Sequence, residues 1–242
     1  DLVALNHASN VTGRVNDAKT ILSRAKAAGA VTLLDASQTL GHIPVKPCEL
    51  GADLVAFTGH KGLRGPQGTG GLYVDPGIEL GQVFVGGTGV RSDLLLHPPE
   101  MPVRLESGTP NVPAFAGLAA ALRWLGDNGA QFARAEDEVG GALREKMRGI
   151  PGVKIFDDFE APAGRLGIVS FKLEGWSVEE TGFILEESFG ISCRSGLHCA
   201  PLVHEAVGSA PEGTVRFSVS GFNTLAEVDR AAAAVEQLAN AN

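Results

Sequence analysis

The sequence predicts an α/β protein with a mostly parallel sheet, followed by a smaller α+β unit at the carboxy terminus. Short apolar runs bounded by glycine and polar residues recur through residues 1–75. A helical pattern separates the first two runs, and strands that are apolar almost throughout are typical of a parallel sheet covered by helices. After "GIPG" at 149–152, strands and helices continue to alternate in a smaller unit.

The first half carries four expected strands: "DLVALN" at 1–6, "AVTLLDAS" at 30–37, "DLVAFTG" at 53–59 and "GGLYV" at 70–74. The first of these is apolar enough to predict a buried strand. Between the first two strands, small and apolar residues at helical spacing predict a helix that stops at Gly29. Residues 112–149 also have a helical pattern, which we expect to break near "GDNGA" at 126–130.

The second half carries the expected strands "GVKIF", "GIVSFKL", "GISCR" and "TVRFSVS". Its helices have recognisable starts, because Ser177-x-x-Glu180 and Thr224-x-x-Glu227 both fit a capping box. A short helix is expected after "GISCR". We therefore predict two domains, 1–129 with the larger sheet and 130–242 with the smaller α+β unit.

Composition narrows the classes of function. The chain has 242 residues, of which 44% are hydrophobic and 20% charged, as in a soluble globular protein. Its net charge of -8 argues against nucleic acid or an anionic membrane as a partner. No apolar run reaches the roughly 18 residues of a membrane span, and no signal pattern opens the chain. Three cysteines cannot form a complete disulfide framework, so we expect a reducing compartment, the cytoplasm.

The stretch "DLVAFTGHKGLRGPQGTGGLYV" at 53–74 places a lysine, Lys61, ahead of a glycine-rich segment. This order excludes a nucleotriphosphatase phosphate loop, in which glycines precede the lysine and Ser or Thr follows it. The stretch also lacks G-x-G-x-x-G, the dinucleotide-binding pattern.

Ligands of open parallel sheets bind at the carboxyl ends of the strands, and three such ends here carry polar side chains. These are His7, Ser9 and Asn10; Asp35, Ser37 and Gln38; and Thr58, His60 and Lys61. Each group also has a purely structural interpretation. Asp35 could be a turn residue or helix cap, Asn10 could shape a turn, and Lys61 could be a solvated loop lysine. Their occurrence at equivalent sheet edges favours a shared site.

A lysine amine, a carboxylate and a phosphate cradle together indicate pyridoxal 5'-phosphate (PLP). A lysine Schiff base holds the aldehyde of this cofactor, and an aspartate pairs with its pyridinium nitrogen. Small hydroxyls and backbone N–H groups around Ser37 and Gly59 suit a dianionic phosphate. We therefore predict Lys61 as the Schiff-base amine, with the following glycines letting the backbone turn around a planar cofactor.

Four motifs carry a family resemblance: "DASQ" at 35–38, "TGHKGLRGPQGTGGLYV" at 58–74, "ESGTPN" at 106–111 and "RSGLHCAP" at 194–201. Together they resemble class V, fold-type I PLP-dependent enzymes of the cysteine desulfurase family, along all 242 residues. "RSGLHCAP" is similar to desulfurases with a short active-cysteine segment, the SUF type linked to iron–sulfur cluster assembly, and to selenocysteine lyases.

The resemblance implies a role for each matching residue. Lys61 would hold PLP, Asp35 would face the ring nitrogen, and Gln38 and Asn10 would lie near the ring hydroxyl. The residues implied near the phosphate are Ser37, Thr58 and His60, with Gly108 and Thr109 reaching the phosphate in the partner subunit of a homodimer. Arg216 would bind the substrate carboxylate in a bidentate manner, and Arg194 would help to position the substrate.

The sequence departs from the family pattern in two places. Leu197 stands where SUF-type relatives often have the first of two histidines, leaving His198 alone before the cysteine. The family also has an amino-terminal stretch, with a Gly-Thr phosphate loop and a histidine that stacks on PLP. This stretch is missing from the sequence, which starts at a later point of the family pattern. From the abrupt start at Asp1 we expect a chain that is entered within a domain and that binds PLP weakly by itself.

Cys199 is the expected nucleophile. We expect it at the start of a short helix, where a helix amino terminus and a nearby arginine lower a thiol pKa. Cys48 is expected to be a small buried or loop residue, and Cys193 to pack on a strand. Zinc is an alternative, because Cys193, His198, Cys199 and His204 are all possible ligands. Their spacing lacks the C-x₂₋₄-C knuckle of structural sites, so we predict no metal.

The resemblance implies a PLP-dependent cysteine desulfurase that converts L-cysteine to L-alanine. It holds the sulfur as a persulfide on Cys199 for a sulfur-acceptor protein. Two alternatives remain open at this point. One is another class V enzyme, a selenocysteine lyase or an aminotransferase, in which Cys199 is less essential. The other is a non-catalytic fragment that folds without holding PLP.

Overall fold

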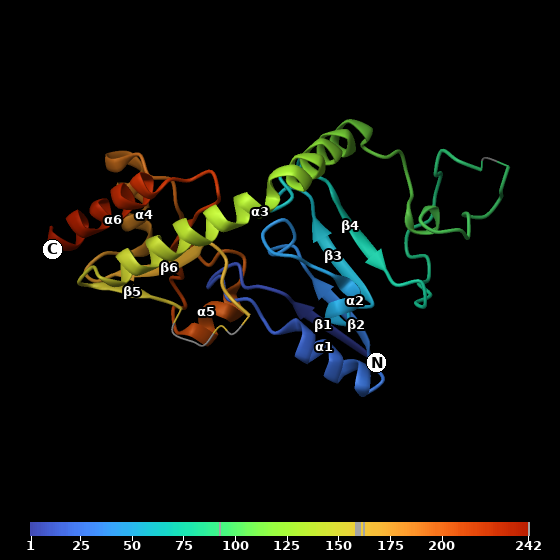
Figure 1. Ribbon diagram of the computed structural model, residues 1–242, viewed down its shortest axis with the longest axis horizontal. Coiled ribbons are helices and arrows are strands. Elements are labelled where there is room, and N and C mark those ends of the chain that lie inside the picture. The colour runs from blue at the N-terminus through green and yellow to red at the C-terminus, as the bar shows by residue number, and fades with distance from the viewer. Residues whose placement is uncertain (92, 158–160, 162, 242) are drawn as a thin grey trace.

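The computed structural model describes residues 1–91, 93–157, 161 and 163–241, arranged as two sheets joined by one long helix (Figure 1). The first sheet has the order β1-β2-β3-β4. Its first three strands are parallel and β4 is antiparallel to β3, which confirms the mostly parallel α/β prediction. The bounds are β1 Leu2–Asn6, β2 Val31–Asp35, β3 Leu54–Thr58 and β4 Gly70–Val74.

Two helices accompany the first sheet, α1 (Ala18–Ala27) and the short α2 (Pro47–Leu50). The Asp17 side chain accepts a hydrogen bond from the Thr20 N–H and so caps α1. Ala18 and Leu22 of α1 are buried against Leu34 of β2. β1 lies at the edge of the sheet and Leu2 is 59% exposed, so the expectation of a buried first strand is wrong.

The second sheet is antiparallel throughout and has the order β5-β6-β8-β7. Its strands are β5 Val153–Ile155, β6 Ile168–Leu173, β7 Arg194–Gly196 and β8 Thr214–Ser218. Its helices are α4 Val178–Phe189, α5 Pro201–Val207 and α6 Leu225–Asn240. The capping boxes predicted at Ser177 and Thr224 are both formed. β7 begins at Arg194 and not within "GIS", because only residues 194–196 pair with β8.

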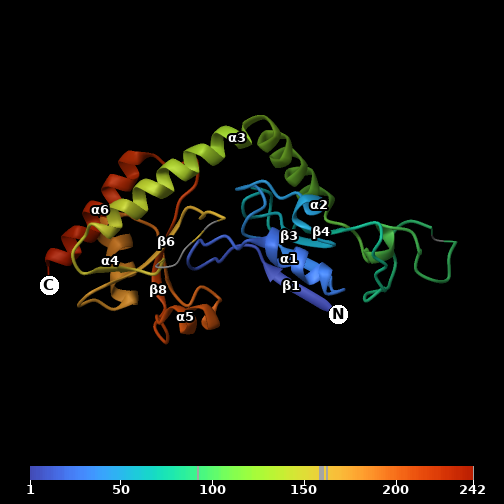
Figure 2. The same ribbon diagram turned by 60° about the horizontal axis from the view of Figure 1, so that its bottom comes forward.

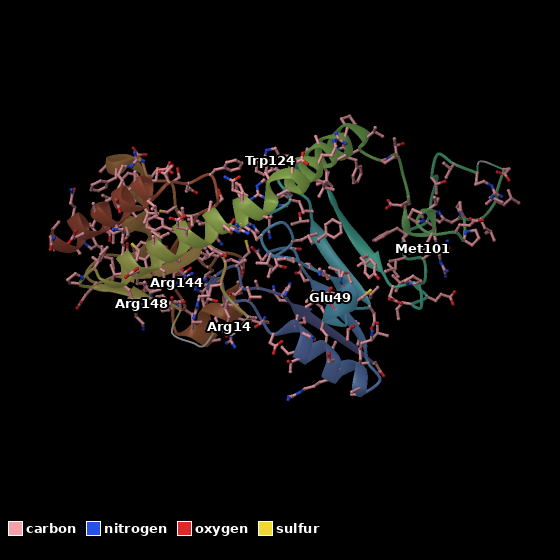
Figure 3. The ribbon with its side chains drawn as sticks, viewed as in Figure 1. Arg14, Glu49, Met101, Trp124, Arg144 and Arg148 are labelled. Carbon is pink, nitrogen blue, oxygen red and sulfur yellow. The ribbon has the colours of Figure 1, made fainter. Side chains whose placement is uncertain are left out.

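Helix α3 (Val112–Arg148) runs from the first sheet to the second and bends on the way (Figure 2). It is one continuous helix, so the predicted break at 126–130 is wrong. The Asn128 side chain donates to the Trp124 carbonyl, which competes with the helical bond to that oxygen and favours a bend. Trp124 lies in the half of α3 nearer the first sheet, whereas Arg144 and Arg148 lie beside the second sheet (Figure 3). The two-domain division at 129 stays a prediction, since α3 passes through it.

A long irregular excursion separates β4 from α3 and contains one short 3₁₀ helix, η1 (Val103–Leu105). It extends away from both sheets, and Met101 lies within it (Figure 3). Large apolar side chains on this segment are exposed, among them Phe84, Leu95 and Leu96. None of the helices described is long and apolar enough to cross a lipid bilayer.

The loop after β1 fastens the two sheets together. The Ser170 hydroxyl of β6 donates to the Val11 carbonyl at 2.5 Å, and the Leu166 N–H donates to the Gly13 carbonyl at 2.8 Å. The Val15 N–H donates in turn to the Gly164 carbonyl. The loop after the first strand is thus held by a side chain of β6 and by backbone groups of the segment that precedes β6.

Candidate active site

A cleft of about 560 Å³ lies between the two sheets and is lined by residues from both. Six residues predicted from the sequence line it: Asn10, Gln38, Lys61, Arg194, Cys199 and Arg216. Its volume lies within the range of small-molecule sites. A larger hollow of about 910 Å³ lies among residues 79–104 of the excursion, and none of the predicted site residues lines it. The cleft between the sheets is therefore where six of the predicted site residues meet.

Lys61 reaches the cleft from the loop that follows β3. Its side chain is exposed, and it makes no hydrogen bond or ion pair with the residues that the structure describes. Gly62 is buried against the Leu40 carbonyl and the His42 ring, where a Cβ atom would collide with both. The Arg64 N–H donates to the Lys61 carbonyl at 2.8 Å. The glycine after the lysine thus permits a close backbone approach that fixes the loop while the amine stays free.

The carboxyl ends of β2 and β3 hold four more predicted residues, which flank the cleft without lining it. Asp35 is half-buried and its Oδ1 accepts a hydrogen bond from the Ser37 N–H at 2.9 Å. Thr58 Oγ1 lies 2.7 Å from His60 Nδ1. Within the described chain, the Asp35 carboxylate has no cationic partner. It is therefore available to a cation brought by a ligand.

Arg216 enters the cleft from β8. Its Nη1 donates to the Asn10 carbonyl at 2.8 Å, whereas its buried Nε has no hydrogen-bond partner in the part of the chain that the structure describes. Burial, and secondarily the nearby Arg194, lower the pKa of the Arg216 guanidinium. An unpaired buried donor on a cation favours an anionic ligand at this position.

Cys199 lies at a tight turn between β7 and α5. The Ala200 N–H donates to the Leu197 carbonyl, and both intervening residues have positive φ, +50° for His198 and +60° for Cys199. This conformation costs an L-residue roughly 1–2 kcal/mol. The Cys199 side chain is exposed, and Arg194 Nη2 donates a hydrogen bond to its sulfur at 3.3 Å. Helix α5 begins only at Pro201, so the thiol stands before the helix and not on its first turn.

The other two cysteines have different surroundings. Burial, and then Glu186, raise the pKa of the Cys193 thiol to about 11, which keeps it protonated near neutral pH. Cys48 is exposed and lies on α2, so it is neither the buried residue nor the loop residue that the sequence suggested. His198 and His204 are both buried, and their ring centroids are 5.4 Å apart. Among the described residues no group of three or more His, Cys, Asp or Glu side chains is arranged to hold a metal ion.

Gly108 and Thr109 are not brought to the cleft of their own chain. Both are exposed on the excursion, where the Gly108 N–H donates to the Gly87 carbonyl at 2.8 Å. Gly108 has a φ of +83°, a conformation that favours glycine. Their predicted contact with a phosphate in a partner subunit stays a prediction.

The aminotransferase class-V family model matches residues 1–231. The chain belongs to this family. A probable cysteine desulfurase of Methanothermobacter thermautotrophicus is 34% identical over 98% of this chain, and a cysteine desulfurase of Pectobacterium atrosepticum is 31% identical over 98%. The chain spans 60% and 58% of these two relatives. The resemblance to cysteine desulfurases noted in the motifs is thereby confirmed.

Solved structures agree with this assignment. The apo cysteine desulfurase of Thermococcus onnurineus NA1 superposes with a TM-score of 0.86 at 32% identity, over 100% of this chain and 60% of that one. The S-sulfonic acid form of the Escherichia coli cysteine desulfurase CsdA gives 0.85 at 30% identity, over 98% and 58%. The class-V chain therefore has the fold-type I arrangement that the sequence predicted.

Three titratable residues that line the cleft were not predicted from the sequence: His42, Arg64 and Glu136. The buried Glu136 of α3 pairs with His42 Nδ1 at 2.8 Å. The Arg64 guanidinium lies 3.8 Å from the centre of the Phe132 ring and donates to the Gly62 carbonyl. Arg64 could have been predicted because it is the cation among the glycines that follow Lys61, whereas a carboxylate in the middle of a helix gives no signal until α3 is placed.

The charges in the cleft fit PLP and an amino-acid substrate. Four cations line it, Lys61, Arg64, Arg194 and Arg216. The one carboxylate described among the lining residues, Glu136, is already paired with His42. Such a cleft suits a phosphate dianion and a substrate carboxylate. The free Lys61 amine and the unpaired Asp35 carboxylate provide the two groups that the aldehyde and pyridinium of PLP require.

Proposed function

We propose that this chain carries the catalytic cleft of a PLP-dependent cysteine desulfurase, which converts L-cysteine to L-alanine and holds the sulfur as a persulfide on Cys199. The observation that carries this proposal is the meeting of Lys61 from the first sheet with Arg216 and Cys199 from the second in one cationic cleft. The names of the relatives support the same reaction, although the chain covers only about 60% of their length.

Each site residue has a role in this proposal. Lys61 binds the cofactor aldehyde and moves the substrate Cα proton, and Asp35 holds the proton on the pyridine nitrogen. Asn10 and Gln38 bind around the ring, with Ser37, Thr58 and His60 toward the phosphate. Arg216 binds the substrate carboxylate and Arg194 orients the substrate. PLP, when bound, supplies an electron sink for the substrate carbanion.

Cys199 supplies the nucleophile for sulfur transfer. Its thiolate bonds to the substrate sulfur while the carbon–sulfur bond of L-cysteine breaks, and the carbon skeleton takes up a proton to leave as alanine. An exposed thiol beside Arg194 suits this role, because it is accessible both to substrate and to a sulfur-acceptor protein. The high pKa of Cys193 argues against that residue as the nucleophile.

The proposal extends to the assembly. Several large apolar side chains of the excursion are exposed, among them Phe84, Leu95 and Leu96, which supports a homodimer with Gly108 and Thr109 of each chain reaching the partner's phosphate site. Delivery of the sulfur to iron–sulfur cluster assembly in the cytoplasm is the physiological setting we propose.

Borohydride reduction tests the cofactor part of the proposal. With PLP added, reduction should leave a phosphopyridoxyl group on Lys61, found by peptide mass spectrometry together with loss of the yellow absorbance. Lys61→Ala should abolish both signals, and Asp35→Ala should weaken PLP binding by roughly tenfold or more, as the loss of a charge-assisted bond predicts. Lys19→Ala, an exposed lysine of α1, is the matched control. An unchanged visible spectrum in Lys61→Ala would contradict the assignment.

A further inference from the structure

The turn that carries Cys199 needs support from its surroundings. Two consecutive residues with side chains, His198 and Cys199, have positive φ, and such conformations persist only where neighbouring groups hold them. The Cys199 side chain is exposed, so its own packing does little to hold the turn. The support must therefore come from His198, which is 2% exposed and directly precedes the cysteine.

The His198 ring is anchored by a single hydroxyl. Its Nε2 lies 3.0 Å from Thr214 Oγ1, and its buried Nδ1 has no hydrogen-bond partner among the described residues. Burial, and then Arg216, lower the pKa of His198 to about 4, so the ring is neutral near pH 7. The Thr214 hydroxyl is the side-chain partner that the structure shows for this neutral buried imidazole, so the position of the ring depends strongly on that contact.

Thr214 is itself fixed in place. It is fully buried at the start of β8, and its Cα pairs with Gly196 of β7. The preceding Gly213 has a φ of +83° and packs so closely on the Gly196 backbone that a Cβ atom would collide with it. The Thr214 hydroxyl therefore comes from β8, the strand that pairs with β7, on which Arg194 lies.

A second tether holds the backbone of the same residue. Asn10 Nδ2 donates to the His198 carbonyl at 2.7 Å, across from the first sheet. His198 is thus held at its ring by Thr214 and at its carbonyl by Asn10. Cys199 then has little freedom, and its sulfur lies within 3.3 Å of Arg194 Nη2.

We propose that Thr214 is a positioning residue for Cys199: its hydroxyl anchors the His198 ring and so keeps the thiol in the cationic cleft beside Arg194. The importance of this position for sulfur transfer rests on the proposed function. The position itself can be measured without the cofactor.

The test compares an anionic with a neutral alkylating reagent. Iodoacetate is attracted to the cations around Cys199, whereas iodoacetamide is not, and the exposed Cys48 of α2 provides an internal reference. At low salt, the iodoacetate-to-iodoacetamide rate ratio at Cys199 should exceed that at Cys48 by about threefold or more, and salt should reduce the excess. Peptide mass spectrometry measures both sites in one sample.

Thr214→Val removes the hydroxyl at nearly constant shape and should bring the Cys199 ratio down to that of Cys48. Thr214→Ser restores the hydroxyl and should keep the wild-type ratio. Thr181→Val removes another buried hydroxyl of the second domain, on α4, and should leave the ratio unchanged. In the enzyme with PLP, Thr214→Val should also lower kcat for alanine release by about tenfold with KM for L-cysteine unchanged, since substrate binding does not use the thiol.

A folded Thr214→Val protein that keeps the wild-type ratio would overturn the proposal, as would loss of the ratio in Thr214→Ser. If the valine variant does not fold, Thr214→Ala must show the same loss. Wild-type protein that releases no alanine would count against the proposed function only, because the alkylation ratio still decides the role of Thr214.

Discussion

His198 links the stability of the chain to the geometry of its candidate nucleophile. The residue is buried, has a single side-chain hydrogen bond and is held in the left-handed region of φ. Burial of a histidine disfavours its charged form. His7 and His204 are also buried, and burial lowers the pKa of each. The three histidines should therefore act in the same direction when the pH falls.

We expect the free energy of unfolding to decrease as the pH falls from 6.5 toward 4. The unfolded chain protonates His198 near 6.5 and the folded chain only near 4, so the unfolded state binds more protons in this interval and acid favours it. A difference of about 2.5 pH units corresponds to roughly 3 kcal/mol. Urea unfolding at a series of pH values measures the slope.

His198→Gln, which cannot titrate here, should show a shallower decrease over the same interval, whereas His60→Gln, at an exposed site, should follow the wild type. Equal slopes in the wild type and His198→Gln would show that the ring is not buried in its neutral form.

At the residue scale, the sequence predicted the residues whose chemistry is unusual for their position. Lys61, Asp35 and Cys199 stand at strand ends or in short motifs, where function is the simplest reason for them. Glu136 and Thr214 could not be predicted, because each is an ordinary residue of a helix or strand. Their importance comes from the residue that the fold places opposite them, His42 in one case and His198 in the other.

At the scale of elements, local sequence patterns predicted helix starts correctly but did not predict that α3 is continuous or where β7 begins. Glycine in "GDNGA" has low helix propensity, yet the helix continues because tertiary packing of both halves outweighs the cost of about 1 kcal/mol per glycine. The predicted capping boxes formed because their bonds are local. β7 was misplaced by a few residues because the extent of a strand depends on its partner strand, which the local sequence does not contain.

Two adjacent glycines of α3 should respond oppositely to alanine. Gly141 is exposed with open space where a Cβ would lie, so Gly141→Ala should stabilise the chain by about 1 kcal/mol through helix propensity. At buried Gly140 a Cβ would lie 3.0 Å from the Gly167 Cα, so Gly140→Ala should destabilise it by roughly 1–3 kcal/mol. Thermal or urea unfolding of both variants measures the effects, and changes of the same sign would contradict this packing of α3 on β6.

At the scale of the whole molecule, the cleft depends on the alignment of two sheets. The loop at 9–15 is held by Ser170 of β6 and by Leu166 and Gly164 of the segment before β6, which brings the Asn10 side chain to His198. α3 joins the same two sheets on another side (Figure 2). The sequence predicted both units but not the contacts that join them, since the hydrogen bonds involved join residues 149 to 188 positions apart.

Ser170→Ala should loosen this fastening. The variant leaves the buried Val11 carbonyl without its hydroxyl donor, at a cost of about 1–3 kcal/mol. Deuterium uptake should increase in peptides covering residues 9–15 and change little in α1. Ser188→Ala, on the exposed side of α4, is the control and should have no effect. Unchanged uptake at 9–15 in Ser170→Ala would show that this bond does not hold the loop.

In the proposed function, one cleft joins a cofactor lysine to a sulfur-accepting cysteine. The most direct measurement is peptide mass spectrometry of the PLP-loaded protein after L-cysteine is added, together with an assay of alanine release in the presence of a reductant. We predict a mass increase of one sulfur atom on the Cys199 peptide. Cys199→Ala should keep the reducible PLP on Lys61 but lose both persulfide and alanine release, while Cys193→Ala and Cys48→Ala should change little. Persulfide on Cys193, or alanine release retained by Cys199→Ala, would show that Cys199 is not the sulfur acceptor.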